Sequence, residues 1–358
     1  MASAVTQSSA LRDAYADASG AFTVRTGGRA IQSMNAYSAA LAFINGELDV
    51  TGDIFAAIRF VLDQPKSKVL DFCYGSLARL SSLMPKRWSA ERNIQFHYDR
   101  SNEFYALFLD SRMQYSEAHF RTPEMSLDDA QAEKLNRICR ALELKSGERF
   151  LDIGCGWGGL ILWAAEHYGV IAHGCTLSRE QLTFTQELIS TRGLQERLSV
   201  ELRHYKDLPG TYDTIASVGM FEHVGKELPA YFRKVHSILG EGGLFLNRGI
   251  VRPEGVRDDP ESLFLQRNVF PGGRLVHLSD VMREGENAGF RVVSMEDCTL
   301  HYALTCRAWV NRLRANQQAC EGLVGPATYR TWLLYLAASA VNFESGTTRA
   351  SQVVFRKP

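Results

Sequence analysis

The sequence predicts an α/β fold, with a parallel β-sheet whose strands are joined by helical crossovers, preceded by a small α+β unit. Two observations lead to this prediction. Short apolar stretches that suit buried strands alternate with stretches that suit helices, and a glycine-rich turn follows one apolar stretch at residues 154–159. Such alternation favours parallel strands with right-handed connections. The 358 residues suit two domains rather than one.

The N-terminal unit is expected to cover residues 1–87. Its first 20 or so residues are polar, and we expect them to be loose. Residues 40–62 predict a strand, a turn at Asn45-Gly46, a second strand and, after another glycine, a helix. A polar connection that begins at Pro85 marks the boundary.

The second domain, 88–358, alternates between the two element types and ends with a cap. Helices are predicted at 130–142, 158–167, 179–192 and 229–239. Strands are predicted at 149–153, 170–175, 199–202, 214–218 and 243–247, with the last two at 291–295 and 352–355. The long helix-compatible stretch within about 303–350 is expected to cover the site as a helical cap.

Charge and cysteine content exclude several classes of protein. Lys plus Arg and Asp plus Glu balance at 40 each, so the chain lacks the broad basic field of nucleic-acid binders. Seven dispersed cysteines without a CxxC pair predict reduced thiols and a cytoplasmic location. No signal-peptide core and no apolar run of about 20 residues is present, which predicts a soluble or peripheral protein. No cluster has metal-ligand spacing, so no metal is predicted.

The most informative local pattern runs from Phe150 to Gly159, Phe-Leu-Asp-Ile-Gly-Cys-Gly-Trp-Gly-Gly. A strand enters a glycine turn that opens a helix, and free N–H groups at a helix start suit an anion such as the carboxylate of methionine. The pattern is GxGxGG rather than the GxGxxG of dinucleotide enzymes. The next strand ends in Cys175-Thr176-Leu177-Ser178, without the acidic ribose ligand of NAD enzymes. A glycine turn that binds nothing is the alternative.

Seven motifs occur in an order that resembles the cyclopropane fatty acid synthase family, including its mycolic acid methyltransferase branch. They are HYDRSNEFY at 97–105, LFLDSRMQYS ending at 116, LDIGCGWGG at 151–159, CTLSREQ at 175–181, GMFEHVG at 219–225, FPGG at 270–273 and HYALT at 301–305. The resemblance covers 88–358, and GELDVTGD at 46–53 is similar to the lipid-engaging domain of longer members. It implies a Rossmann-like class I methyltransferase sheet, S-adenosylmethionine as cofactor and an unsaturated phospholipid or fatty acyl substrate.

The resemblance also implies twelve cofactor-binding residues, most of which follow the ends of strands, where open α/β sheets bind ligands. They are Tyr115 and Ser116 at the methionine end, Asp152, Gly154, Gly156 and Gly158 along the cofactor, Thr176, Leu177 and Gln181 at the ribose, Tyr205 and Lys206 at the adenine, and Gly219 near the methyl donor.

In the family, an alkene carbon attacks the sulfonium methyl, and a bound bicarbonate is thought to take a proton from the resulting cation. Aromatic faces can stabilise such a cation. Of the four bicarbonate ligands that the family pattern implies, Glu222 and Tyr302 match. Glu117 stands where the family has cysteine, and Arg248 where it has histidine. A further cap-helix cysteine is replaced by Ser339. Bicarbonate is therefore doubtful here.

Two hypotheses follow for these departures. In the first, Glu117 supplies the carboxylate that bicarbonate supplies elsewhere, Arg248 pairs with Glu117 or Glu222, and the product is a cyclopropane. In the second, Glu117 and Arg248 form a structural ion pair, no ring closes, and the product is a methyl-branched or methylated unsaturated chain. A small-molecule N- or C-methyltransferase and a non-enzymatic cofactor or lipid binder are further alternatives.

A lipid substrate requires an apolar channel and a membrane-facing surface. We expect the protein to act peripherally at the inner face of a membrane, and a homo-oligomer is left open. Basic residues could meet anionic headgroups, and cap aromatic residues could line the channel or form core. The basic candidates are Lys66, Lys68, Lys86 and Arg87, and the aromatic ones are Trp309, Tyr329, Trp332 and Tyr335.

Overall fold

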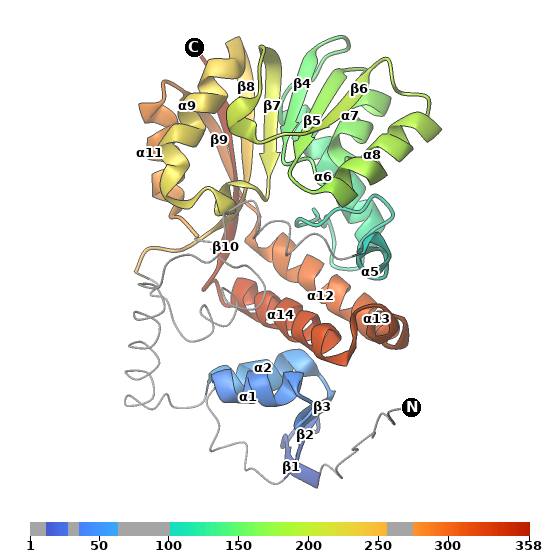
Figure 1. The fold of residues 1–358 in the computed structure, drawn as a ribbon. Helices are drawn as coiled ribbons and strands as arrows, with labels where there is room; N and C mark the ends of the chain where they lie inside the picture. Colours follow the sequence, from blue (N-terminus) through green and yellow to red (C-terminus); the bar gives the residue numbers. More distant parts are fainter. Residues whose placement is uncertain (1–11, 28–35, 64–100, 256–274) are drawn as a thin grey trace.

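The computed structural model describes residues 12–27, 36–63, 101–255 and 275–358. The N-terminal unit is a three-stranded antiparallel sheet, in the order β1-β2-β3, with two helices beside it (Figure 1). Its elements are β1 Arg12–Ala16, β2 Phe22–Thr26, α1 Ala36–Ile44, β3 Leu48–Gly52 and α2 Ile54–Leu62. The predicted boundary near Pro85, the four basic residues between Lys66 and Arg87, and FPGG at 270–273 lie outside the described residues.

Two predictions for this unit are wrong. Arg12–Ala16, expected to be loose, forms β1 and pairs with β2, because backbone pairing orders a strand whatever its polarity. The predicted first strand is helix α1, since Ala39, Ala42 and Phe43 recur at helical spacing and are buried together. The following strand and helix are confirmed as β3 and α2.

The second domain contains a seven-stranded sheet in the order β6-β5-β4-β7-β8-β10-β9. The first five strands in that order pair in parallel, as predicted. The exception is β10, which inserts antiparallel between β8 and β9, because the long cap returns the chain from the opposite end of the sheet. The strands are β4 Arg149–Ile153, β5 Ile171–Thr176, β6 Leu198–Leu202, β7 Tyr212–Val218, β8 Leu239–Val251, β9 Arg291–Asp297 and β10 Arg349–Arg356.

Alternate residues of these strands enter two separate cores. Leu151 and Phe245 belong to one apolar cluster, whereas their neighbours Phe150 and Leu246 belong to another. Because successive residues face opposite sides, the sheet is covered on both faces, which explains why every residue of β4 after Arg149 is buried. The helices of this domain are α5 Asn102–Ala106, α6 Leu127–Ala141, α7 Gly159–Tyr168, α8 Arg179–Thr191, α9 Leu228–Ile238 and α11 Leu278–Asn287.

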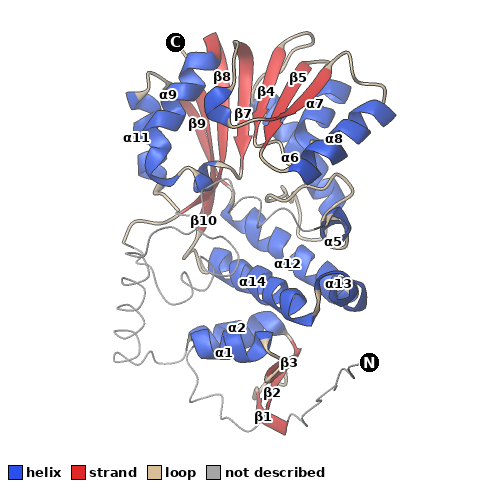
Figure 2. Cartoon of the chain, in the orientation of Figure 1, coloured by secondary structure: helices blue, strands red, loops and turns tan. Residues whose placement is uncertain are grey.

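The predicted cap consists of α12 Thr299–Ala315, α13 Gln317–Val324 and α14 Pro326–Glu344 (Figure 2). The N-terminal unit packs on α14, so that the cap lies between the sheet and that unit. Glu344 of α14 pairs with both Arg59 of α2 and Arg307 of α12. The guanidinium carbon of Arg307 also lies 4.1 Å from the ring centre of Phe55. Within the described residues, no helix is long and apolar enough to cross a membrane.

Candidate active site

The glycine turn after β4 has the conformation that its composition requires. Gly154, Gly156 and Gly158 have φ angles of +79°, +55° and +79°, in the left-handed region that side chains disfavour. The N–H groups of Gly154 and Cys155 both donate to the carbonyl of Cys175, each at 3.0 Å. These bonds fix the turn to the end of β5, and α7 begins at once at its far side.

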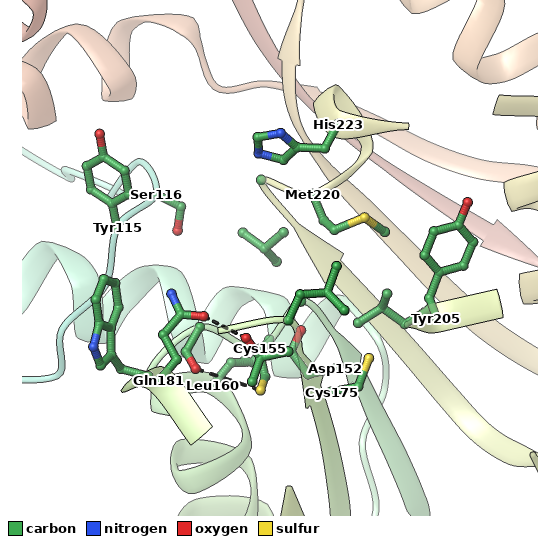
Figure 3. A pocket seen from close by; sticks show the side chains of 18 of the residues that line it. Tyr115, Ser116, Asp152, Cys155, Leu160, Cys175, Gln181, Tyr205, Met220 and His223 are labelled. Carbon is green, nitrogen blue, oxygen red and sulfur yellow. Dashed lines mark hydrogen bonds between the residues drawn. The ribbon is translucent and has the colours of Figure 1, made fainter. Parts of the chain in front are cut away.

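A pocket opens at the carboxyl ends of β4, β5 and β7, where the strand order changes direction. Ten of the twelve residues predicted to bind the cofactor line it: Tyr115, Ser116, Asp152, Gly154, Gly156, Thr176, Leu177, Gln181, Tyr205 and Gly219. Tyr115 and Ser116 lie on one side and Tyr205 on the other (Figure 3). This separation agrees with the two ends of the cofactor that the resemblance assigned to them.

Gly158 and Lys206 do not line this pocket. A Cβ built on Gly158 would lie 2.4 Å from Cγ2 of Thr185, so this glycine permits close packing of α7 against α8. The ammonium of Lys206 pairs with the carboxylate of Glu227 at 2.5 Å on the exposed side of the loop. Motif spacing predicted that both residues lie near the cofactor. In the structure, Gly158 faces α8 and the side chain of Lys206 faces Glu227.

Two polar side chains of the pocket wall have buried atoms that make no hydrogen bond within the described part of the chain. Oδ1 of Asp152 and the hydroxyl of Tyr205 are buried without a hydrogen-bond partner among the described residues. Burial raises the pKa of Asp152 to about 7, against the opposing effect of Lys134. A Cβ built on Gly156 or Gly219 would meet no atom within 4 Å, so the backbone here is open to close approach. These features fit a nucleoside that carries an amino acid, as S-adenosylmethionine does.

Sequence reasoning missed other residues of the pocket wall, above all Lys134. Its Nζ donates to Oε1 of Gln114 at 2.8 Å and to Oγ of Ser116 at 2.9 Å. A signal existed, because Gln131 and Lys134 interrupt the apolar face that α6 buries through Leu135 and Ile138. His223, which follows Glu222 in the GMFEHVG motif, also lines the pocket, and burial lowers its pKa to about 4.

Glu117 and Arg248 form a fully buried ion pair. Nε of Arg248 donates to Oε1 of Glu117 at 2.7 Å, and the two side chains are 0% and 1% exposed. The pairing is therefore with Glu117 and not with Glu222, which the sequence had left open. Neither residue lines the cofactor pocket, but the carbonyl of Arg248 accepts from the N–H of Gly219 at 2.8 Å, which joins the pair to the pocket wall.

A row of side chains across three strands holds Arg248. Gln352 of β10 stands opposite Arg248 of β8 and Glu296 of β9 in the strand registers. Nη1 of Arg248 donates to Oε1 of Gln352 at 3.0 Å, and Glu296 pairs with Arg137 at 2.7 Å. Only the antiparallel insertion of β10 brings these residues together.

Glu222 and Tyr302 are both close enough to Glu117 of this pair to be affected by its charge. Oε1 of Glu222 accepts from the N–H of Ile250 at 2.7 Å, whereas Oε2 is buried without a partner among the described residues. Burial raises the pKa of Glu222 to about 7. The ring of Tyr302 stacks on Phe343 with centroids 4.3 Å apart, and burial, followed by the charge of Glu117, raises the pKa of its phenol.

Aromatic rings from the cap pack against Tyr115, which lines the pocket. The centroid of Tyr115 lies 5.2 Å from that of Trp309 and 5.9 Å from that of Trp332. All four cap aromatic residues named from the sequence are core residues, and one of them, Tyr335, also lines an apolar groove; they are Trp309, Tyr329, Trp332 and Tyr335. In the described part of the chain, no three His, Cys, Asp or Glu residues are grouped to hold a metal ion.

Comparisons with known proteins agree with this geometry. Residues 86–353 match the model of the family described as mycolic acid cyclopropane synthetase. The chain is 41% identical over 326 residues to a Pseudomonas putida protein named "Probable fatty acid methyltransferase", covering 88% of this chain and 81% of that one. It is 33% identical over 277 residues to cyclopropane mycolic acid synthase 3 of Mycobacterium tuberculosis, covering 74% of this chain and 96% of that one.

A solved structure shares both fold and cofactor. Mycolic acid cyclopropane synthase CmaA1, complexed with SAH and CTAB, superposes with a TM-score of 0.72 at 31% identity, covering 76% of this chain and all of that one. The match includes the class I methyltransferase sheet, and SAH is the product form of S-adenosylmethionine. The chain therefore belongs to the mycolic acid cyclopropane synthetase family and is an S-adenosylmethionine-dependent methyltransferase.

Proposed function

We propose that the chain transfers the methyl group of S-adenosylmethionine to a carbon–carbon double bond in an unsaturated acyl chain of a lipid. The observation that carries this proposal is the presence of two carboxylates close to the aromatic cluster around Tyr115: Glu117, which is fully buried, and Glu222, whose Oε2 is buried without a partner among the described residues. Methyl transfer to an alkene creates a carbocation, which requires negative charge, aromatic faces and exclusion of water. The relatives named for fatty acids and mycolic acids support the lipid assignment.

The residues of the chain take separate parts in this reaction. Tyr115, Ser116 and Asp152 hold the amino-acid end of the cofactor, which supplies an electrophilic methyl group when bound. The rings of Tyr302 and Trp309, whose centroids lie 6.4 Å apart, are the aromatic candidates to stabilise the developing cation. Oε2 of Glu222, buried and without a partner among the described residues, is the candidate proton acceptor.

An apolar groove supports a long-chain substrate. It lies between the N-terminal unit and α14, and its lining includes Phe43, Ile54, Val61, Leu334 and Tyr335. Tyr335 lines this groove and also belongs to the apolar cluster on which Tyr115 and Tyr302 pack, so the groove adjoins the aromatic core of the site. We assign the groove to part of the acyl chain, which leaves the membrane to reach the cofactor.

Two products are consistent with this function. Ring closure requires a base for the transferred methyl group, and Glu117 is the candidate because it replaces a bicarbonate ligand. Its pairing with Arg248 at 2.7 Å favours the non-cyclising alternative, since Oε1 of Glu117 already accepts a hydrogen bond from the guanidinium. Loss of a different proton would then give a methylated unsaturated chain.

The deciding experiment is label transfer to lipid. Purified enzyme is incubated with cofactor labelled with ¹³C in its methyl group and with vesicles of an unsaturated phospholipid; a saturated phospholipid is the control. Label is expected only in the unsaturated lipid. A high-field ring signal in the proton NMR spectrum identifies a cyclopropane, and a vinylic or branched methyl signal identifies the alternative. An enzyme that binds cofactor but labels neither lipid would refute the proposal, and labelling of an added amine instead would favour a small-molecule methyltransferase.

The variant Glu117→Gln separates the two roles of this residue. Loss of a base would lower cyclopropane yield by about 10²-fold or more while cofactor binding persists. Unchanged yield from the folded variant would assign Glu117 a structural role.

Membrane contact is tested by co-sedimentation with anionic liposomes at low and high salt. Failure to pellet at either salt would oppose a peripheral role.

A further inference from the structure

Lys134 is a fully buried cation that has no role in the methyl transfer proposed above. It belongs to α6, is 0% exposed and contributes to the wall of the cofactor pocket. An ammonium has three donors, and Gln114 and Ser116 accept from two of them. Burying an ammonium is costly unless its charge is compensated, so this position requires an explanation.

The described part of the chain offers Lys134 no ion pair. The acidic residues that influence it are Glu117, Asp110 and Asp152, and none lies within 4 Å of its Nζ. Glu117 is engaged by Arg248, and Asp110 accepts from the backbone N–H of Gln114 at 2.7 Å. Burial and then the charge of Arg248 therefore lower the pKa of Lys134 to about 7. An anionic ligand in the pocket would restore the balance.

The surroundings of Lys134 point to a particular end of the ligand. Its hydrogen bonds go to the 114–116 segment, which lies on the side of the pocket away from Tyr205 (Figure 3). Gln131, one turn earlier on α6, donates to the carbonyl of Ser116 at 2.9 Å and fixes the same segment. Asp152, which also lines the pocket, has a buried oxygen without a partner among the described residues. The ammonium of Lys134 and the carboxylate of Asp152 thus both belong to the part of the pocket that we assign to the amino-acid end of the cofactor.

We propose that Lys134 binds the α-carboxylate of the cofactor, while Asp152 receives its ammonium, so that the enzyme selects cofactors by their carboxylate. The two buried charges complement a zwitterion, and each lacks its own ion-pair partner until that zwitterion arrives. The hydrogen bonds to Gln114 and Ser116 orient the ammonium of Lys134 toward the pocket. Lys134 is therefore a binding residue in addition to an anchor for the segment.

The test compares two ligands that differ by one group. S-adenosylhomocysteine and its decarboxylated analogue, which keeps the amine, are titrated calorimetrically into the wild-type protein and into Lys134→Met. The wild type is expected to prefer the carboxylated ligand by about 10- to 100-fold, the value of a hydrogen bond to a charged group. Lys134→Met is expected to lose that preference and to bind the analogue within about threefold of the wild type.

Three controls keep the result interpretable. Lys134→Arg retains the charge and is expected to retain most of the preference. Lys134→Gln keeps a donor without the charge and replaces Lys134→Met if that variant unfolds. Lys145→Met removes an exposed lysine that does not line the pocket, and the preference for the carboxylate is expected to survive. Equal weakening of both ligands in the folded Lys134 variants, or no weakening at all, would overturn the assignment and leave Lys134 a structural anchor.

Discussion

At the scale of single residues, the site depends on charges that the fold has removed from water. Glu117 and Arg248 satisfy one another at 0–1% exposure, and Glu222 and Asp152 are carboxylates whose pKa burial raises to about 7. Groups with displaced pKa values gather at catalytic sites because the same desolvation that is costly for folding prepares them for chemistry. Two consequences can be measured directly.

Breaking the buried pair should be more harmful than replacing it. Glu117→Gln leaves the guanidinium of Arg248 buried without a counter-charge and should lower the free energy of unfolding by about 3–5 kcal/mol. The double variant Glu117→Met with Arg248→Met should recover most of that loss, because neither charge then remains. Urea unfolding of the wild type, of Glu117→Met and Arg248→Met separately, and of the double variant completes the cycle. A single variant as stable as the wild type would contradict a buried ion pair.

The rate should depend on pH through Glu222. Its raised pKa of about 7 means that the carboxyl group is protonated at lower pH and then has no capacity to accept a proton. At saturating cofactor and lipid, kcat should fall about tenfold per pH unit below 7 and level off above it. Glu222→Asp is expected to keep a pH-dependent limb at a shifted position, and Glu222→Gln is expected to have low, pH-independent turnover. A wild-type kcat that is constant from pH 5.5 to 8.5 would exclude this role.

At the scale of elements, one glycine of the turn after β4 leaves room for a ligand, and another allows close packing of a helix. Gly156 faces open space in the pocket, whereas Gly158 faces Thr185 of α8. Both have positive φ, so the backbone strain of a substitution is shared and the side-chain environment decides the difference.

Alanine at the two positions should therefore fail in different ways. Gly158→Ala should lower the free energy of unfolding by about 2–4 kcal/mol, from left-handed backbone strain and the clash with Thr185, with little change in cofactor affinity once folded. Thr185→Ser removes Cγ2, keeps the hydroxyl bond to the carbonyl of Gln181 and should rescue part of the loss. Gly156→Ala should instead weaken S-adenosylhomocysteine binding. Thermal unfolding and calorimetry would reveal a reversed pattern if the assignment is incorrect.

At the scale of the whole molecule, the helical cap lies between the domain that carries the cofactor pocket and the N-terminal unit that lines the apolar groove. One side of α14 packs into the aromatic core near Tyr115, and the other lines the apolar groove shared with the N-terminal unit. Arg59, Arg307 and Glu344 hold the three parts together. The arrangement places an apolar path on the side of the cap away from the cofactor.

Filling the groove should impair the lipid reaction alone. Ala338 lines the groove, and Ala338→Trp would displace several methylene groups of a substrate at about 0.8 kcal/mol each, so that kcat/KM for phospholipid should fall about tenfold or more. Cofactor affinity should stay unchanged. Ala327→Trp, at an exposed position of the same helix, is the matched control. Equal kcat/KM values in both variants and the wild type would remove the groove from the substrate path.

The sequence by itself determined the local features of this protein. Apolar period and glycine chemistry predicted the strands β4 to β8 and the helices between them, because these signals arise within a few residues of the chain. The ordered motifs located ten residues of the pocket wall and identified Glu117 and Arg248 as departures from the family pattern.

Only the tertiary structure decided the features that depend on distant pairing. The antiparallel insertion of β10 sets Gln352 beside Arg248, and the packing of α6 on the 114–116 segment brings Lys134 into the pocket. The direction of Gly158 toward Thr185 likewise follows from helix packing. No local pattern encodes these contacts, since strand register and helix contact are chosen by the burial of the whole core.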